Sequence, residues 1–426
     1  MIDRSIQPEI KSIEEFVIPK PQITVLPNGV ELYTINMGEQ DVVRIDIMFS
    51  SGKWDQTKNL EAVITNLMLK EGAGDLASSK IAELLDFYGS WMQNSVTQHN
   101  SYLTLYALNK HFASLLPILE IMIKEPTFPE EEFKTIMERQ KRQYLVESQK
   151  VDNLATYSAI EQLFGINHPY GKHAVAEDFD SLNVDDLKDY HQRHYHSQNC
   201  RIFLTGKISE EHVKIVEESF GLSEWGAGKD KSEAKNFPVV SSDLFYHKTE
   251  KADAVQSAIR ISSLSIERNH PDFNGLRFLN TVLGGYFGSR LMASIREEKG
   301  YTYGIGSSIV TQQKAGYLTI ATQTGFEYVD PLVEAVFEEM EMLKSEPISQ
   351  DELDRVRNYL LGEFTRSFDG PFSIADAHIS ILANNLGVDY YENQLKTIQQ
   401  IDSLELKRLA LKYLNRDNFY ISIAGR

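Results

Sequence analysis

The second half of this 426-residue chain repeats the order of elements of the first half. LKDYHQRHYHSQNCRIFLTG at residues 187–206 aligns without gaps with LKRLALKYLNRDNFYISIAG at residues 406–425. EPTFPEEEF, from residue 125, resembles EPISQDEL, from residue 346, and the expected strand YLTLYAL from Tyr102 resembles YLTIATQ from Tyr317. Repetition over this length predicts two related domains that arose by duplication.

Apolar periodicity places the elements of the first half. An Asn-Gly pair between β-type runs predicts a hairpin over residues 22–35, and alternation predicts strands over 42–49, within 90–107 and over 200–204. Helical spacing predicts helices over 60–69, 79–88, 112–123, 130–147, 155–164 and 184–194. Runs of strands and runs of helices are separated along the chain. This separation favours the α+β class, with a mixed and mainly antiparallel sheet in each half and helices on one face, over a doubly wound parallel sheet.

A polar segment with three glycines, GLSEWGAGKDKSEAKNFP at residues 221–238, has no apolar period and reads as a linker. We therefore predict an N-terminal domain at 1–220, a linker at 221–238 and a C-terminal domain at 239–426.

Charge and composition exclude several classes of function. Acidic residues outnumber basic ones by 61 to 43, so we expect neither a nucleic acid nor an anionic membrane as partner. The single cysteine, Cys200, cannot form an internal disulfide. The first residues lack the pattern of a secretory signal, and no run approaches the roughly 18 apolar residues of a membrane span. We expect a cytoplasmic protein, or a periplasmic one if a leader has been removed.

Five segments, in order, resemble a known family. They are LPNGVELYTI from residue 26, FSSGKWDQ from 49, the stretch from GAGD at 72 to YLTLYAL, HPYGKHAVAEDFDSL from 168 and LGGYFGSRLMASIREEKGYTYGIGSS from 283. These segments resemble the M16 family of zinc peptidases, which includes insulin-degrading enzyme, pitrilysin and the mitochondrial processing peptidase. The resemblance spans nearly the whole chain. It implies two homologous α/β halves that form one half of a clamshell around a peptide.

The chemistry of that family depends on an inverted HxxEH helix. Two histidines bind zinc, the glutamate activates water, and a later glutamate completes the site. In this chain the matching positions are Ala62, Thr65 and Asn66, so the motif is degenerate. No HxxEH or HExxH occurs among the 11 histidines. We therefore expect no metal and no cofactor on this chain, and no peptidase activity from it alone.

Other groups with metal-binding potential do not replace this motif. The nearest is His191-x-x-His194-x-His196, which we interpret as exposed histidines at a helix end, with adventitious metal binding as the alternative. The downstream helix carries Glu138 and Glu147, and Gln143 lies near the expected ligand position. A carboxylate without two imidazoles does not hold zinc tightly.

The second half of active relatives contributes an arginine and a tyrosine to the substrate, and the matching residues here are Arg296 and Tyr303. Arginine can hold substrate carbonyls with a rigid fork of donors, and a tyrosine hydroxyl can donate to an oxyanion. The local alternatives are a solvated helix end for Arg296 and an ordinary strand residue for Tyr303.

A glycine-rich segment carries Gly284, Gly285, Gly288 and Ser289. It lacks the ending of a P-loop and the spacing of a dinucleotide fingerprint. The local interpretation is a flexible turn that opens a helix over residues 290–296. The resemblance implies a second possibility, a glycine-rich loop that handles substrate.

The leading hypothesis is a non-catalytic subunit that binds a peptide substrate and supplies Arg296 and Tyr303 to the zinc site of an HxxEH-bearing partner in a heterodimer. The alternatives are a peptide-binding homodimer, a structural subunit that keeps the fold for assembly, and a metallopeptidase with unusual ligands.

Overall fold

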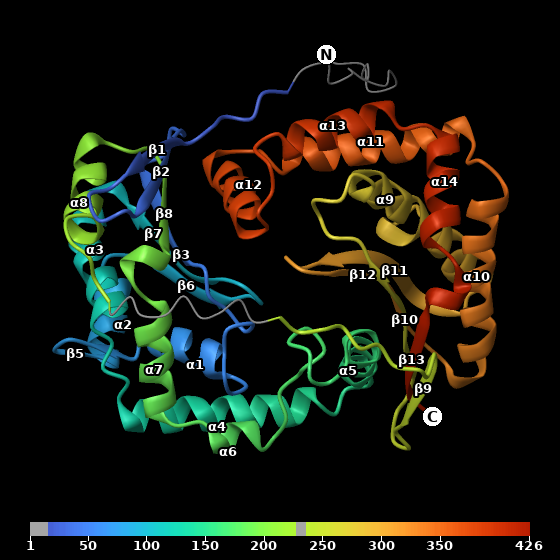
Figure 1. Ribbon diagram of the computed structural model, residues 1–426, viewed down its shortest axis with the longest axis horizontal. Coiled ribbons are helices and arrows are strands. Elements are labelled where there is room, and N and C mark those ends of the chain that lie inside the picture. The colour runs from blue at the N-terminus through green and yellow to red at the C-terminus, as the bar shows by residue number, and fades with distance from the viewer. Residues whose placement is uncertain (1–15, 227–235) are drawn as a thin grey trace, which may run out of the picture.

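The computed structural model describes residues 16–226 and 236–426, which form two mixed sheets, one in each half of the molecule (Figure 1). The first sheet has the strand order β1-β2-β8-β3-β7-β6. Its strands are β1 (Gln22–Val25), β2 (Glu31–Asn36), β3 (Val42–Phe49), β6 (Trp91–Val96), β7 (Ser101–Leu108) and β8 (Cys200–Gly206). The second has the order β11-β12-β10-β13-β9. Its strands are β9 (Tyr246–Glu250), β10 (Ser257–Ser265), β11 (Thr302–Thr311), β12 (Gly316–Thr324) and β13 (Tyr420–Gly425).

The two sheets share one topology, which confirms the duplication. The order β2-β8-β3-β7-β6 in the first sheet corresponds strand by strand to β9-β13-β10-β12-β11 in the second. In each sheet one pair, β2 with β8 and β9 with β13, is parallel, and the remaining pairs are antiparallel, including that of β1, which extends the first sheet beyond β2. The expected α+β class with two homologous halves is therefore confirmed.

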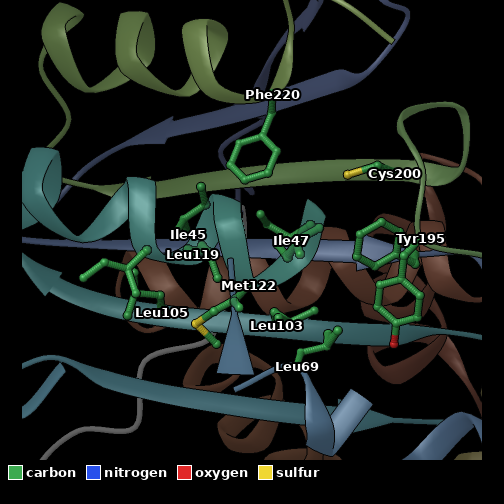
Figure 2. Close-up of a cluster of buried hydrophobic side chains, with 14 of the residues drawn as sticks. Ile45, Ile47, Leu69, Leu103, Leu105, Leu119, Met122, Tyr195, Cys200 and Phe220 are labelled. Atoms are coloured by element: carbon green, nitrogen blue, oxygen red, sulfur yellow. The ribbon is translucent and has the colours of Figure 1, made fainter. Parts of the chain in front are cut away.

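The core of the first half lies between its sheet and its own helices. Ile45 and Ile47 of β3 pack with Leu119 and Met122 and are fully or almost fully buried (Figure 2). Burial raises the pKa of the nearby Cys200 thiol, which makes it an unreactive core residue. The helices of this half are α1 (Glu61–Met68), α2 (Ser78–Phe87), α3 (Asn109–Lys124), α4 (Glu130–Glu147), α5 (Val151–Phe164), α6 (Asp178–Ser181), α7 (Val184–His194) and α8 (Glu210–Phe220). A short ribbon joins β4 (Gly72–Ala73) to β5 (Leu76–Ala77), and a 3-10 turn, η1 (Ser197–Asn199), precedes β8.

The second half has a separate core of the same design, in which Ile259 and Ile261 of β10 pack against the helices that follow. The π-helical segment η3 (Met292–Glu298) takes the place of most of the regular helix expected over residues 290–296, and a second π-helical segment, η2 (Thr281–Gly285), follows α9. The α-helices are α9 (Phe273–Asn280), α10 (Val329–Ser345), α11 (Gln350–Arg366), α12 (Pro371–Ala383), α13 (Tyr390–Gln400) and α14 (Ser403–Tyr413). The 3-10 turns are η4 (Phe326–Tyr328) and η5 (Arg416–Asn418).

Each half also sends one helix to the sheet of the other half. Helix α5 packs against β10 and β13, and helix α12 packs against β8 and β2 (Figure 1). The helices lie on the sheet faces opposite the two cores, because they meet Arg260 and Arg44, which alternate with the core-facing isoleucines. The halves are thus interlocked by reciprocal exchange of a helix.

The predicted boundaries at 1–220, 221–238 and 239–426 stay a prediction. Residues 227–235 of the predicted linker lie outside the described part of the chain. Within the described ranges, no helix is long and apolar enough to cross a bilayer.

Candidate functional site

The three degenerate motif positions lie on α1 and are buried. Ala62 and Thr65 are 0% exposed, and Asn66 is 1% exposed. The Asn66 side-chain amide donates to the hydroxyl of Tyr195 (3.0 Å), and the Asn66 backbone oxygen accepts from the side-chain amide of Asn94 on β6 (2.6 Å). The Thr65 hydroxyl has no hydrogen-bond partner among the described residues. This set of a methyl, a hydroxyl and an already bonded amide does not fit a zinc ion.

The turn before α1 is held in a strained shape. Leu60 has φ = 72°, a left-handed conformation that is uncommon for a bulky residue. The buried carboxylate of Glu61 accepts hydrogen bonds from the backbone and hydroxyl of Thr57 (2.6 and 3.0 Å) and from the backbone of Lys58 (3.3 Å). Arg193 of α7 completes this set with an ion pair of 2.9 Å. Glu61 therefore fixes the start of the helix that carries the motif in active relatives.

The histidines near the end of α7 are not exposed as expected. His191 is largely buried, its Nε2 lies 2.8 Å from the backbone oxygen of Ile123, and burial lowers its pKa to about 4. His194 stacks on Tyr190, and His196 is half-buried with its pKa lowered by burial. The expectation failed because side chains of α7 pack against the core, which helical spacing alone does not reveal.

The candidate carboxylates of α4 point away from the core. The Glu138 side chain is 72% exposed and lies 3.8 Å from Arg142, and Glu147 pairs with Lys150 at 2.7 Å. Gln143 is exposed. Across residues 16–226 and 236–426, no group of three or more His, Cys, Asp or Glu side chains is placed to hold a metal ion.

Arg296 lies in the π-helical segment η3, with its guanidinium carbon 4.9 Å from the centre of the Phe287 ring. Within the described residues it forms no ion pair, whereas Arg290, one and a half turns earlier, is held by Glu352 through two hydrogen bonds of 2.9 and 2.8 Å. π-Helical segments are rare and are frequent at functional sites. Arg296 is therefore held in place by a ring and still has its donors available.

Tyr303 lies on β11, an edge strand of the second sheet, and is 92% exposed. The register of β11 on β12 shifts between Thr302 and Ile305, so Tyr303 lies in a bulge. Bulges often redirect a side chain next to an active site. The described part of the chain offers its hydroxyl no hydrogen-bond partner, and within the same residues no hydrogen bond or ring contact joins Tyr303 to Arg296.

The glycine-rich segment connects η2 to η3. A Cβ on Gly284 would lie 2.6 Å from the Ser307 hydroxyl, and one on Gly288 would lie 2.8 Å from the Tyr286 ring. Gly285 has more room, because its nearest neighbour, Asn280, would be 3.2 Å away. Ser289 is buried. Close packing against β11 explains Gly284 in structural terms, and a substrate-handling role of the segment stays a prediction.

The HPYG segment lies where the two halves meet. The Tyr170 hydroxyl lies 2.6 Å from His99 Nε2, in the first half, and accepts from the backbone N–H of Lys314, in the turn between β11 and β12 (3.3 Å). Trp54 packs against the Tyr170 ring, and the Lys314 ammonium lies 4.6 Å from the Trp54 ring centre. The segment joins the halves, a role that sequence reasoning did not assign. The role of Glu61 in fixing the start of α1 was not predicted either. The only signal in the sequence was its position directly before Ala62.

Comparison with known proteins shows which proteins this chain resembles. A family model described as "Peptidase M16 inactive domain" matches residues 181–360. The chain is 26% identical to "Uncharacterized zinc protease YmxG" of Bacillus subtilis, over 90% of this chain and 92% of that protein. It is 24% identical to "Non-peptidase homolog YmxG" of Helicobacter pylori, over 69% and 68% of the two chains.

A further relative and a solved structure extend the comparison. The chain is 26% identical to "Mitochondrial-processing peptidase subunit alpha-1" of Dictyostelium discoideum, over 47% of this chain and 31% of that protein. The crystal structure titled peptidase M16 inactive domain, from Pseudomonas fluorescens, is 25% identical and superimposes with a TM-score of 0.85, over 95% of this chain and 98% of the other.

Proposed function

The chain belongs to the M16 peptidase family and lacks its zinc motif, and from that premise we propose that it is the non-catalytic subunit of a heterodimeric peptidase. Its partner is a homologous chain with an intact HxxEH motif and the zinc. The substrate is a peptide enclosed between the two chains. This chain contributes Arg296 and Tyr303 to the partner's site.

The positions of the zinc motif support the first part of the proposal. Ala62 and Thr65 offer no ligand, and the Asn66 amide is already bonded to Tyr195. No other HxxEH occurs in the chain. A hydrolytic metal therefore has to come from another chain.

The observation that carries the proposal is the availability of Tyr303. A tyrosine that is 92% exposed, on an edge strand and without a hydrogen bond inside its own described chain, contributes little to folding. Arg296 lies on η3, which packs against the same strand, and it likewise has no carboxylate partner there. Two donors that the fold itself leaves unused fit a role in binding another molecule.

Their chemistry suits the cleavage of a peptide bond. The partner's zinc would activate the attacking water. The negative charge that develops on the substrate carbonyl oxygen would be stabilised by the Tyr303 hydroxyl. The guanidinium of Arg296 presents several N–H donors in one plane and can bind substrate carbonyl oxygens, which places the scissile bond.

Similarity to a protein named as a subunit of the mitochondrial processing peptidase supports the pairing. In the proposed complex, the glycine-rich segment with Gly284, Gly285, Gly288 and Ser289 borders the peptide, next to η3. Gly285 has the most room of the three glycines. A substitution that adds a side chain at Gly285 therefore tests whether the segment contacts the peptide.

The test is reconstitution with an HxxEH homologue encoded in the same genome. Peptidase activity of the purified heterodimer is measured with the wild-type chain, with Arg296→Ala and with Tyr303→Phe. Loss of one oxyanion donor lowers kcat by about 100-fold or more, so Tyr303→Phe should do the same while leaving the heterodimer intact. Arg142→Ala, on exposed α4, is the matched control. Full activity of both variants would contradict the proposal and favour a peptide-binding or structural homodimer.

A further inference from the structure

The second half contains a pocket of about 420 Å³, and of its lining residues only Gly285 enters the proposed function. It lies between α9 and η2, the edge strand β11 and helix α11, and its wall includes Arg277, Tyr359 and Leu360. This volume lies within the range of pockets that bind small ligands or single side chains of a peptide.

The pocket is the duplicated counterpart of the degenerate zinc motif. The same shift along the chain that aligns Tyr102 with Tyr317 aligns Ala62, Thr65 and Asn66 with Arg277, Asn280 and Thr281. All three of these second-half residues line the pocket. In the first half, Ala62, Thr65 and Asn66 are buried by packing. In the second half, the three aligned residues border an open pocket.

The cationic groups around the pocket are two arginines, and the other polar groups are hydroxyls that donate or accept, the Glu363 carboxylate and the side chain of Asn280, whose oxygen has no partner among the described residues. Arg268 donates from Nε to the hydroxyl of Tyr390 (3.0 Å) and from Nη1 to the hydroxyl of Ser380 (2.8 Å), which fixes the guanidinium while Nη2 has no partner among the described residues. The Tyr390 oxygen accepts the bond from Arg268 and can still donate its own proton. Arg277 adds a second guanidinium from α9.

Neither arginine of the pocket forms an ion pair within residues 16–226 and 236–426. This is notable because the chain has 61 acidic residues and 43 basic ones, so carboxylates are plentiful. The one carboxylate in the pocket wall, Glu363, is bonded to Arg366. Two unpaired guanidinium groups in a concave site favour an oxyanion as ligand, because arginine binds a carboxylate or phosphate through paired N–H donors.

The remaining wall distinguishes between these two anions. Ser307, Ser308 and Ile309 of β11 all line the pocket. Since successive strand side chains point to opposite faces, a pocket that touches three consecutive residues reaches the edge of the strand. Edge strands can bind extended peptides, and since the Ser307 backbone oxygen already accepts from Asn280 (3.2 Å), a peptide would meet β11 beyond Ser307. Phe273 and Leu360 provide an apolar surface for a side chain. Phosphate would use neither feature.

We propose that this pocket binds the C-terminal carboxylate and last side chain of a peptide, with Arg268 and Arg277 receiving the carboxylate. The inference goes beyond the proposed function and does not depend on a partner subunit. The second half would then contain a binding site for a peptide C-terminus in addition to Arg296, Tyr303 and the glycine-rich segment.

Calorimetric titration of the purified full chain tests the inference. The probes are N-acetyl-Ala-Ala-Phe with a free carboxylate, the same peptide as its C-terminal amide, and inorganic phosphate. We expect the acid to bind at least tenfold more tightly than the amide, and phosphate to bind more weakly than the acid. Arg277→Ala should weaken binding of the acid at least tenfold, while Arg139→Ala, on exposed α4, should leave it unchanged.

Arg277→Gln keeps the length of the side chain and serves as a second variant if Arg277→Ala lowers the melting temperature. Equal affinity for the acid and the amide would overturn the inference. So would phosphate as the tightest ligand, no binding of the acid at millimolar concentration, or wild-type binding by a folded Arg277→Gln variant.

Discussion

Arg260 on β10 forms an ion pair with Asp152 on α5, with 2.6 Å between Nη2 and Oδ1, and this contact joins the two halves of the molecule. A similar pair of the same length, 2.6 Å, joins Arg44 on β3 to Asp376 on α12 at the other contact between the halves. Helices α5 and α12 therefore each contact the sheet of the other half through an ion pair between a helix aspartate and a strand arginine. Both contacts between the halves therefore use the same kind of ion pair, although Asp152 and Asp376 lie at different positions of their helices.

The two ion pairs predict unequal effects of mutation. Asp152→Ala removes the carboxylate partner of Arg260, whose side chain is 10% exposed, and we expect a loss of about 2 kcal/mol in the free energy of unfolding. Asp376→Ala should cost less, because Arg44 keeps the buried Asp46 at 2.7 Å. Urea denaturation measures both.

Asp185→Ala is the control for this comparison, since the Asp185 side chain is 91% exposed and lies 3.7 Å from Lys188. A surface pair of this kind contributes at most about 1 kcal/mol. Equal effects of the Asp152 and Asp376 variants would contradict the role of Asp46 as a second partner of Arg44.

Restoring the zinc motif should fail. In the triple variant Ala62→His, Thr65→Glu and Asn66→His, three larger side chains enter buried positions, and overpacking costs about 1–3 kcal/mol at each. The bond from Asn66 to Tyr195 is also lost. We expect a lower melting temperature and no stoichiometric zinc by elemental analysis.

Thr65→Val is the matched control for that variant. It keeps the shape of the side chain and removes a buried hydroxyl without a hydrogen-bond partner among the described residues. Stability should stay the same or rise by about 1 kcal/mol. Tight zinc binding by a stable triple variant would show that the site at α1 is preorganised for metal after all.

Acid should destabilise the protein through His191. Burial lowers the pKa of this imidazole from 6.5 to about 4, so the folded state holds it neutral while the unfolded state takes up a proton below about pH 6.5. The stabilisation is complete above that pH and is lost as the pH falls towards 4. It amounts to about 3 kcal/mol for this shift.

His191→Gln should flatten the fall in unfolding free energy between pH 7 and pH 4.5, and His247→Gln, at an exposed position, should not. His99, whose pKa burial also lowers to about 4, contributes in the same direction and keeps part of the slope in the first variant. An unchanged pH profile in the His191 variant would show that this histidine is protonated in the folded protein.

The strands and most helices could be predicted from the sequence, because they depend on local periodicity and on the repeat. The exchange of α5 and α12 could not. In VVRIDIMF, alternation predicts a strand but does not indicate that α12, more than 300 residues later, packs on the face that carries Arg44 and Asp46. The identity of a covering element is a long-range property that a strand pattern does not contain.

The candidate site shows the same division. Loss of the zinc ligands at Ala62, Thr65 and Asn66 is a property of residue type and was read directly. The burial of His191 and the contact of Arg296 with Phe287 depend on π-helical geometry and on packing between distant segments, which no local pattern encodes.

The ring of Phe287 should matter for complementation. It lies 4.9 Å from the Arg296 guanidinium and is 68% exposed, so the cation–π contact contributes about 0.5–1 kcal/mol to positioning. Phe287→Ala should lower kcat/KM of the reconstituted heterodimer about two- to fivefold, and Phe287→Tyr should restore it. A Phe287→Tyr variant as impaired as Phe287→Ala would argue against a positioning role for the ring.

The most direct measurement of the central claim is peptidase activity and zinc content of the pure chain, alone and mixed with an HxxEH homologue from the same genome. The account predicts no zinc and no cleavage for the chain alone, and cleavage on mixing that exceeds the activity of the homologue alone. Stoichiometric zinc with cleavage by the single chain, or no gain on mixing, would contradict it.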